Sequence, residues 1–135
     1  MAMFDRYLRA RTLLRREIPG LAGVYVFGSA AAGRARADSD VDLAFLAQDA
    51  MPKARVMDLA EQLALAFGLD VDLVDLRLAP TILQMQVVSD GVLIDRTDPK
   101  AIGLFEVGVL REYADLKYRR RGIERDVVAR GRVHA

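Results

Sequence analysis

Residues 24–46 of the chain read VYVFGSAAAGRARADSDVDLAFL. The first part of this stretch is an apolar run rich in valine and aromatic residues that ends at Gly28 and Ser29, as expected of a β-strand that stops at a turn. A second apolar run follows, in which side chains alternate so that Asp40 and Asp42 share one face and the large apolar residues share the other. The stretch therefore predicts two strands joined by a loop of small and charged residues.

Outward from this stretch, the chain alternates between helical and strand patterns. Apolar residues recur at helical spacing in some segments and at every second position in others. This alternation predicts an α/β or α+β fold and leaves the order of the strands open. We expect helices at 3–18, 52–67, 80–89 and from 99 to about 121, and strands at 22–27, 41–45, 70–76 and 92–94. Beyond residue 122 the chain either continues as helix or frays.

Length and composition restrict the chemistry that the chain can perform. With 135 residues it has the size of about one domain. It contains no cysteine, which excludes disulfides, thiolate zinc sites and cysteine nucleophiles. A single histidine argues against a Ser-His-Asp triad and against a histidine-rich metal site. Any catalysis must therefore depend on carboxylates, hydroxyls, backbone groups and arginines.

The charges are nearly balanced overall but unevenly distributed. There are 20 basic and 19 acidic residues, too small an excess for a protein that binds mainly to a phosphate backbone. Residues 111–135 hold 8 of the basic and 4 of the acidic residues, so a basic C-terminal region follows an acidic body. Residues 1–16 are charged throughout, unlike a signal peptide, and no apolar run is long enough to span a membrane. We expect a cytoplasmic protein whose basic region is a surface for a partner.

Three aspartates form the candidate catalytic site. Asp40 and Asp42 lie two residues apart on one strand, and Asp72 faces away from its apolar neighbours on a later strand. Like charges on one face repel each other unless a cation neutralises them, and oxygen ligands of this kind suit Mg²⁺. Taken alone, Asp40 and Asp42 are equally consistent with a solvated face. If the strand of Asp72 lies beside theirs, the three carboxylates match the needs of two-metal phosphoryl or nucleotidyl transfer.

Gly28 and Ser29 form a candidate phosphate-binding turn. Glycine allows backbone N–H groups to approach an anion closely, and the serine hydroxyl can bond to a phosphate oxygen. Such turns are also common without any ligand, so a purely structural role is the alternative.

The spacing of these residues resembles a known signature. Gly28-Ser29, ten residues and then Asp40-Val41-Asp42 are similar to the motif of the DNA polymerase β-type nucleotidyltransferase superfamily, and residues 24–46 resemble its minimal nucleotidyltransferase members. The resemblance implies a small mixed β-sheet flanked by helices, with a C-terminal helix, in one domain over residues 1–135. It also implies that Asp40, Asp42 and Asp72 bind metal and perform catalysis, and that Gly28 and Ser29 hold the triphosphate.

Two points of this assignment stay open. Asp70 and Asp75 are alternatives to Asp72 as the third carboxylate, although Asp75 has the opposite parity on its strand. Members of the family often carry an arginine directly after Gly-Ser, where this chain has alanines; Arg34 and Arg36 come slightly later and are candidates to replace it.

The resemblance further implies an activity and a partner. The expected reaction is Mg²⁺-dependent transfer of AMP from ATP to a hydroxyl, a tyrosine of a HEPN-type ribonuclease toxin encoded alongside, in a hetero-oligomer in which this chain is the antitoxin. Direct binding of nucleic acid is not expected. One alternative is a catalytically silent binding module that occludes the toxin. Another is a small-molecule nucleotidyltransferase of the aminoglycoside-modifying kind.

Overall fold

The computed structural model describes residues 2–28, 33 and 40–134 of the chain. Every helix and strand predicted from the sequence is present, and all boundaries before the last helix differ from the prediction by at most two residues. The helices are α1 (Met3–Glu17), α2 (Lys53–Phe67), α3 (Thr81–Asp90) and α4 (Pro99–His134). The strands are β1 (Leu21–Phe27), β2 (Val41–Ala47), β3 (Val71–Asp75) and β4 (Val92–Arg96).

The four strands form one mixed sheet in the order β3-β2-β1-β4. β1 is antiparallel to both β2 and β4, whereas β2 and β3 are parallel and are connected through α2. The register pairs Phe27 with Asp42 across β1 and β2, and Asp42 with Asp72 across β2 and β3. Asp42 therefore lies between the end of β1 and the start of β3.

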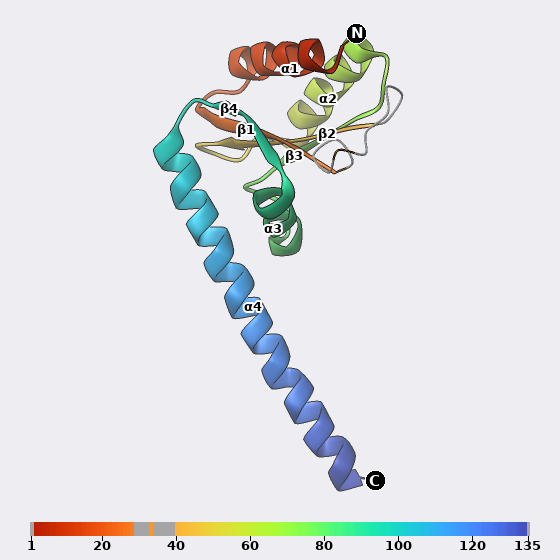
Figure 1. Ribbon diagram of the computed structural model, residues 1–135, viewed down its shortest axis with the longest axis vertical. Coiled ribbons are helices and arrows are strands. Elements are labelled where there is room, and N and C mark those ends of the chain that lie inside the picture. The colour runs from red at the N-terminus through yellow and green to blue at the C-terminus, as the bar shows by residue number, and fades with distance from the viewer. Residues whose placement is uncertain (1, 29–32, 34–39, 135) are drawn as a thin grey trace.

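Helices cover both faces of the sheet, with α1 and α2 on one face and α3 and α4 on the other (Figure 1). Because side chains alternate along a strand, Leu43 and Phe45 of β2 enter the core under α1 and α2, whereas Ala44 and Leu46 enter the core under α3 and α4. Asp42 lies two residues before Ala44 on β2, so its side chain points to the same face of the sheet as that of Ala44, as predicted from the sequence. The carboxylate of Asp42 consequently belongs to the face that α3 and α4 cover.

The last helix is much longer than the minimum expected from the sequence. Of the two possibilities beyond residue 122, the structure shows the continuous helix, and α4 spans 36 residues. At ~1.5 Å per residue its length is about 54 Å, and its C-terminal part extends well away from the sheet and from α3 (Figure 1). In the described part of the chain, no helix is both long and apolar enough to cross a membrane.

An ion pair between a half-exposed arginine and a buried aspartate connects α1 to the edge of the sheet. The Arg15 guanidinium donates two hydrogen bonds to Asp95 of β4, at 2.8 Å and 2.5 Å, and the Asp95 side chain is inaccessible to solvent. Arg11 adds a second positive charge at 3.7 Å. The hydrogen bonds from Arg15 outweigh the effect of burial and hold the pKa of Asp95 below its ordinary value. The ionised carboxylate therefore stabilises the folded state.

Replacing Asp95 with asparagine is expected to lower the free energy of unfolding at neutral pH by about 2–3 kcal/mol, because a charged acceptor of two hydrogen bonds is lost. The folded-state pKa lies below the unfolded one, so this stabilisation is present above about pH 4 and is lost as the pH falls through the folded-state pKa. Urea unfolding between pH 3 and pH 7 should show a smaller gain in stability with rising pH for Asp95→Asn than for the wild type. Equal pH dependence of the two proteins would contradict the assignment.

Candidate active site

Asp42 and Asp72 lie side by side at the start of two parallel strands. They are paired in the register of β2 and β3, and neighbouring strands of a sheet are about 4.8 Å apart. The backbone N–H of Val41 donates a hydrogen bond of 2.9 Å to the carbonyl of Asp70, which fixes this register just ahead of the two aspartates. Asp42 is half-buried and Asp72 is exposed. The structure thus brings together two of the three carboxylates predicted from the sequence, on a surface open to a ligand.

Gly28 follows β1 and packs directly against Asp42. Its φ of +71° lies in the left-handed region, which side chains other than glycine rarely adopt. A Cβ atom at this position would lie 2.2 Å from the Oδ2 atom of Asp42, far inside any permitted contact. The sequence predicted that Gly28 serves phosphate binding, and it gave no sign of this contact. The absence of a side chain at residue 28 leaves room for the carboxylate of Asp42.

The electrostatic environment of Asp42 favours a bound cation. Burial raises the pKa of Asp42 above its ordinary value, and the negative charges of Asp72 and Asp40 raise the pKa further. Both causes make the ionised carboxylate less favourable in the protein alone. A divalent cation bound between the carboxylates would attract all of them and offset their mutual repulsion, and it would therefore lower the pKa of Asp42.

Asp40 lies next to this pair, at the residue that precedes β2. It is exposed and lines an open hollow together with Asp70 and with Glu61 of α2. Within the described residues, no group of three or more histidine or acidic side chains is already gathered in metal-binding geometry. The described arrangement is thus a close pair, Asp42 and Asp72, with Asp40 within electrostatic reach.

Asp75, an alternative third carboxylate, has a structural role on the other face of the sheet. It is buried, and its two carboxylate oxygens accept hydrogen bonds from the backbone N–H groups of Met51, at 2.9 Å, and Arg77, at 3.0 Å. Met51 packs against the core under α1 and α2. As predicted from the sequence, Asp75 therefore lies on the opposite face of the sheet from Asp72, and it points away from Asp42.

Several predicted site residues lie outside the described residues. These are Ser29, the alanines after it, and both candidate phosphate-binding arginines, Arg34 and Arg36. The described part of the predicted site consists of Gly28 and the aspartates. An oxygen-rich pair of carboxylates beside a glycine turn suits a divalent cation and, through it, the phosphates of a nucleotide.

The chain is similar to known proteins in both sequence and fold. Residues 11–100 match the family model described as polymerase beta, nucleotidyltransferase. The chain is 42% identical over 117 residues to the protein adenylyltransferase MntA of Shewanella oneidensis, an alignment that covers 87% of this chain and 84% of the relative.

Solved structures agree with this relationship over nearly the whole chain. A chain of a toxin–antitoxin crystal structure with AMP-PNP superposes with a TM-score of 0.80 at 39% identity, covering 90% of this chain and 98% of that one. A chain from the structure of a tri-AMPylated Shewanella oneidensis HEPN toxin in complex with MNT antitoxin superposes with a TM-score of 0.79 at 36% identity, covering 94% and 99%. By its matched segment, its sequence identity to MntA and its fold, the chain belongs to the polymerase beta nucleotidyltransferase family.

Proposed function

We propose that this chain transfers AMP from ATP to a tyrosine hydroxyl of a HEPN-type toxin and thereby acts as the antitoxin. The observation that carries the proposal is the pairing of Asp42 with Asp72 beside Gly28, in a fold shared with a structure of an AMPylated toxin and its antitoxin. The similarity to a protein adenylyltransferase supports the same reaction. A structure of a related toxin–antitoxin with AMP-PNP supports ATP as the nucleotide.

Magnesium is the cofactor that fits the residues present. The donor set consists of carboxylate oxygens, which magnesium prefers, and the pKa of Asp42 is raised by the two charges that a cation would neutralise. The absence of a side chain at Gly28 leaves room for the carboxylate of Asp42. Asp40, Asp42 and Asp72 would hold the metal, with Asp72 favoured over Asp75 because Asp75 is engaged by backbone N–H groups on the other face. When bound, Mg²⁺ supplies charge neutralisation on the phosphates and lowers the pKa of the acceptor hydroxyl.

The transfer requires one bond to form and one to break. The acceptor oxygen bonds to the α-phosphorus of ATP while the bond from that phosphorus to the oxygen bridging to the β-phosphate breaks. AMP is thereby attached to the tyrosine, and pyrophosphate leaves. The proton of the hydroxyl passes to the carboxylate of Asp72, which is exposed and can return it to water. Gly28 and Ser29 would orient the triphosphate.

The position of the label in ATP tests this function directly. The chain is incubated with its HEPN-type partner, Mg²⁺ and ATP that carries a radioactive phosphorus at either the α or the γ position. We expect the α label on the partner and no γ label, because AMP rather than phosphate is transferred. Removal of divalent cations with EDTA should abolish labelling, and added Mg²⁺ should restore it. Transfer of the γ label would instead indicate phosphoryl transfer.

The labelling experiment and a thermal-shift screen together separate the enzyme from the two alternatives. Inhibition of the toxin without any label would favour a binding module that acts by occlusion. Stabilisation by aminoglycosides in a thermal-shift screen, with no labelling of a protein partner, would favour a small-molecule nucleotidyltransferase.

A further inference from the structure

Residues 111–125 of α4 have little of the packing that usually stabilises a helix. Among the residues of α4 whose burial the structure describes, up to residue 125, Val109 is the last buried one, and beyond residue 110 only Tyr113 and Leu116 are half-buried. From residue 110 to the end of the helix, about 37 Å of helix extends past the body at ~1.5 Å per residue. Helical stability in proteins comes mainly from packing of an apolar face. This part of α4 is therefore suited to contact with another molecule.

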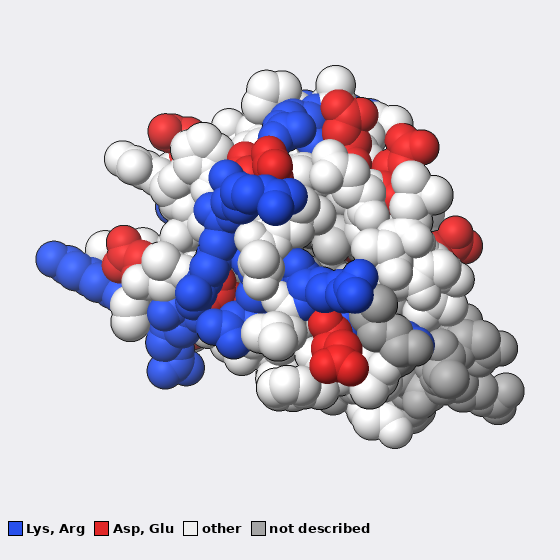
Figure 2. All heavy atoms as spheres, turned by 90° about the horizontal axis from the view of Figure 1, so that it is seen from above, with Lys and Arg blue, Asp and Glu red and all other residues white. Residues whose placement is uncertain are grey.

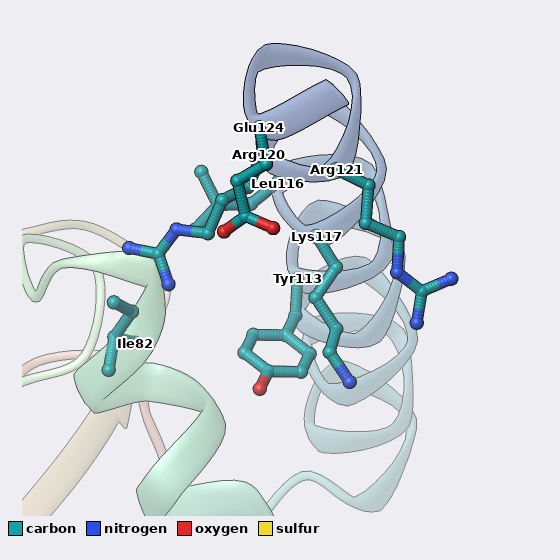
Figure 3. Close-up of a pocket in the computed structure, with 7 residues that line it drawn as sticks. All are labelled: Ile82, Tyr113, Leu116, Lys117, Arg120, Arg121 and Glu124. Atoms are coloured by element: carbon teal, nitrogen blue, oxygen red, sulfur yellow. The ribbon is translucent and has the colours of Figure 1, made fainter. Parts of the chain in front are cut away.

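A pocket lies between α3 and α4, where the two helices diverge. It has a volume of about 350 Å³ and lies between Ile82 of α3 and the helix opposite. The ring of Tyr113 and the side chain of Leu116 supply apolar surface, and the Nζ atom of Lys117 lies 5.7 Å from the centre of the Tyr113 ring. Arg120 extends toward α3 across the pocket (Figure 3), and Arg121 lines it as well. The pocket thus combines an apolar floor with a rim that holds three basic side chains and one acidic side chain, Glu124.

The charge of residues 111–125 indicates which kind of partner this part of α4 would bind. Residues 111–125 contain six basic and three acidic side chains, so the surface favours an acidic ligand. Glu112, Asp115 and Glu124 interrupt the basic residues, and a phosphate backbone would be repelled at each of them. Exposed apolar residues, Tyr118 at 80% and Ile123 at 64% exposure, continue along the helix beyond the pocket. This pattern fits a protein segment with acidic and apolar side chains better than it fits RNA.

The position of the pocket relative to the active site supports the same conclusion. α3 and α4 cover the face of the sheet that carries Asp42 and Asp72, so a partner held by α3 and α4 lies on the side where its hydroxyl must be delivered. The molecule has a second basic surface on the side of α1, whose basic residues are all arginines, and the view from above shows a stripe of basic side chains there with acidic groups beside it (Figure 2). That surface lies on the opposite face of the sheet, and Arg15 there is already paired with Asp95.

We propose that the α3–α4 pocket and the exposed part of α4 that follows it, residues 111–125, form the docking surface for a segment of the HEPN-type toxin that carries acidic and apolar side chains. This inference rests on the proposed function for the identity of the partner. Apolar side chains of the toxin segment pack on Tyr113 and Leu116, and its carboxylates pair with Lys117 and Arg120. Docking here holds the toxin on the face of the sheet that bears the catalytic carboxylates.

Two substitutions of opposite sign test the docking surface. Binding of the toxin is measured by calorimetry without nucleotide, so the measurement does not depend on transfer. Arg120→Glu is expected to weaken binding at least ~10-fold, and Glu124→Lys to strengthen it, because the toxin segment is acidic. Arg9→Glu, an equal change of charge at an exposed position of α1, is the matched control and should leave the affinity unchanged. Circular dichroism checks that each variant is folded.

The outcomes separate this inference from the proposed function. If the wild-type chain binds the toxin through Arg120 but transfers no AMP, the docking surface stands and the proposed function fails. If the wild-type chain transfers AMP and Arg120→Glu binds as tightly as the wild type, the docking surface is overturned. It is also overturned if Arg120→Glu abolishes only self-association of the chain, or only its binding to an RNA oligonucleotide, while its affinity for the toxin is retained.

Discussion

Replacing Asp42 with asparagine is expected to lower the rate of AMP transfer to the toxin by on the order of 10²–10³-fold. The substitution keeps the shape of the side chain and removes the negative charge that lies between Gly28 and Asp72. Without that charge, the site loses the paired carboxylates that suit a divalent cation. The measurement is kcat/KM for labelling of the toxin by ATP. Asp58→Asn, the same chemical change at an exposed position of α2, is the matched control and should retain full activity.

The stability of Asp42→Asn is expected to differ from that of an ordinary loss-of-function variant. The folded-state pKa of Asp42 is raised by burial and by Asp72 and Asp40, so its ionised form destabilises the metal-free protein. A carboxyl group whose pKa is raised in the folded state contributes most to the free energy of unfolding at low pH. That contribution is lost as the pH rises through the folded-state pKa of the group. At neutral pH without metal, Asp42→Asn should therefore unfold at the same temperature as the wild type or at a higher one. A clear loss of stability would show that Asp42 has a structural role instead.

Replacing Gly28 with alanine is expected to lower AMP transfer on the order of 100-fold, because the new methyl group displaces the carboxylate of Asp42. The added Cβ atom would lie 2.2 Å from Oδ2 of Asp42. The backbone conformation adds a cost of about 1–2 kcal/mol for a residue with a side chain. Both activity and thermal stability should be measured, since the clash and the backbone strain act on different quantities.

Gly68→Ala separates these two effects. Gly68 ends α2 with a φ of +67°, close to the +71° of Gly28, but a Cβ atom there would meet nothing within 4 Å. This variant should lose about 1 kcal/mol of stability through backbone strain and should keep its transfer activity once folded. Equal losses of activity in Gly28→Ala and Gly68→Ala would argue that the contact with Asp42 has no catalytic importance.

The sequence predicted the elements of the fold because their periodicities are strong and their ends are marked. Pro52 precedes α2 and Gly68 follows it, and the alternation of β2 assigned Asp42 to one face and Phe45 to the other. That parity also distinguished Asp72 from Asp75. These are local properties, and each depends on residues that are close together in the chain.

The features that escaped prediction depend on contacts between distant segments. The parallel pairing that aligns Asp42 with Asp72 joins strands separated by α2, and periodicity carries no information about it. The contact between Gly28 and Asp42 arises because β1 and β2 are antiparallel neighbours. The continuation of α4 to His134 lacked a clear signal because Gly122 and the mixed charges are compatible with both helix and frayed chain.

Covalent modification of the toxin by this chain, through the carboxylates around Asp42, would change the mass of the toxin. The intact mass of the toxin is measured after co-expression with either the wild-type chain or Asp42→Asn. We expect the toxin to gain the mass of one or more adenylyl groups only with the wild-type chain, and peptide mapping to place them on a tyrosine. An unmodified toxin whose activity is nevertheless suppressed by the wild-type chain would show that the chain neutralises it by binding and not by AMP transfer.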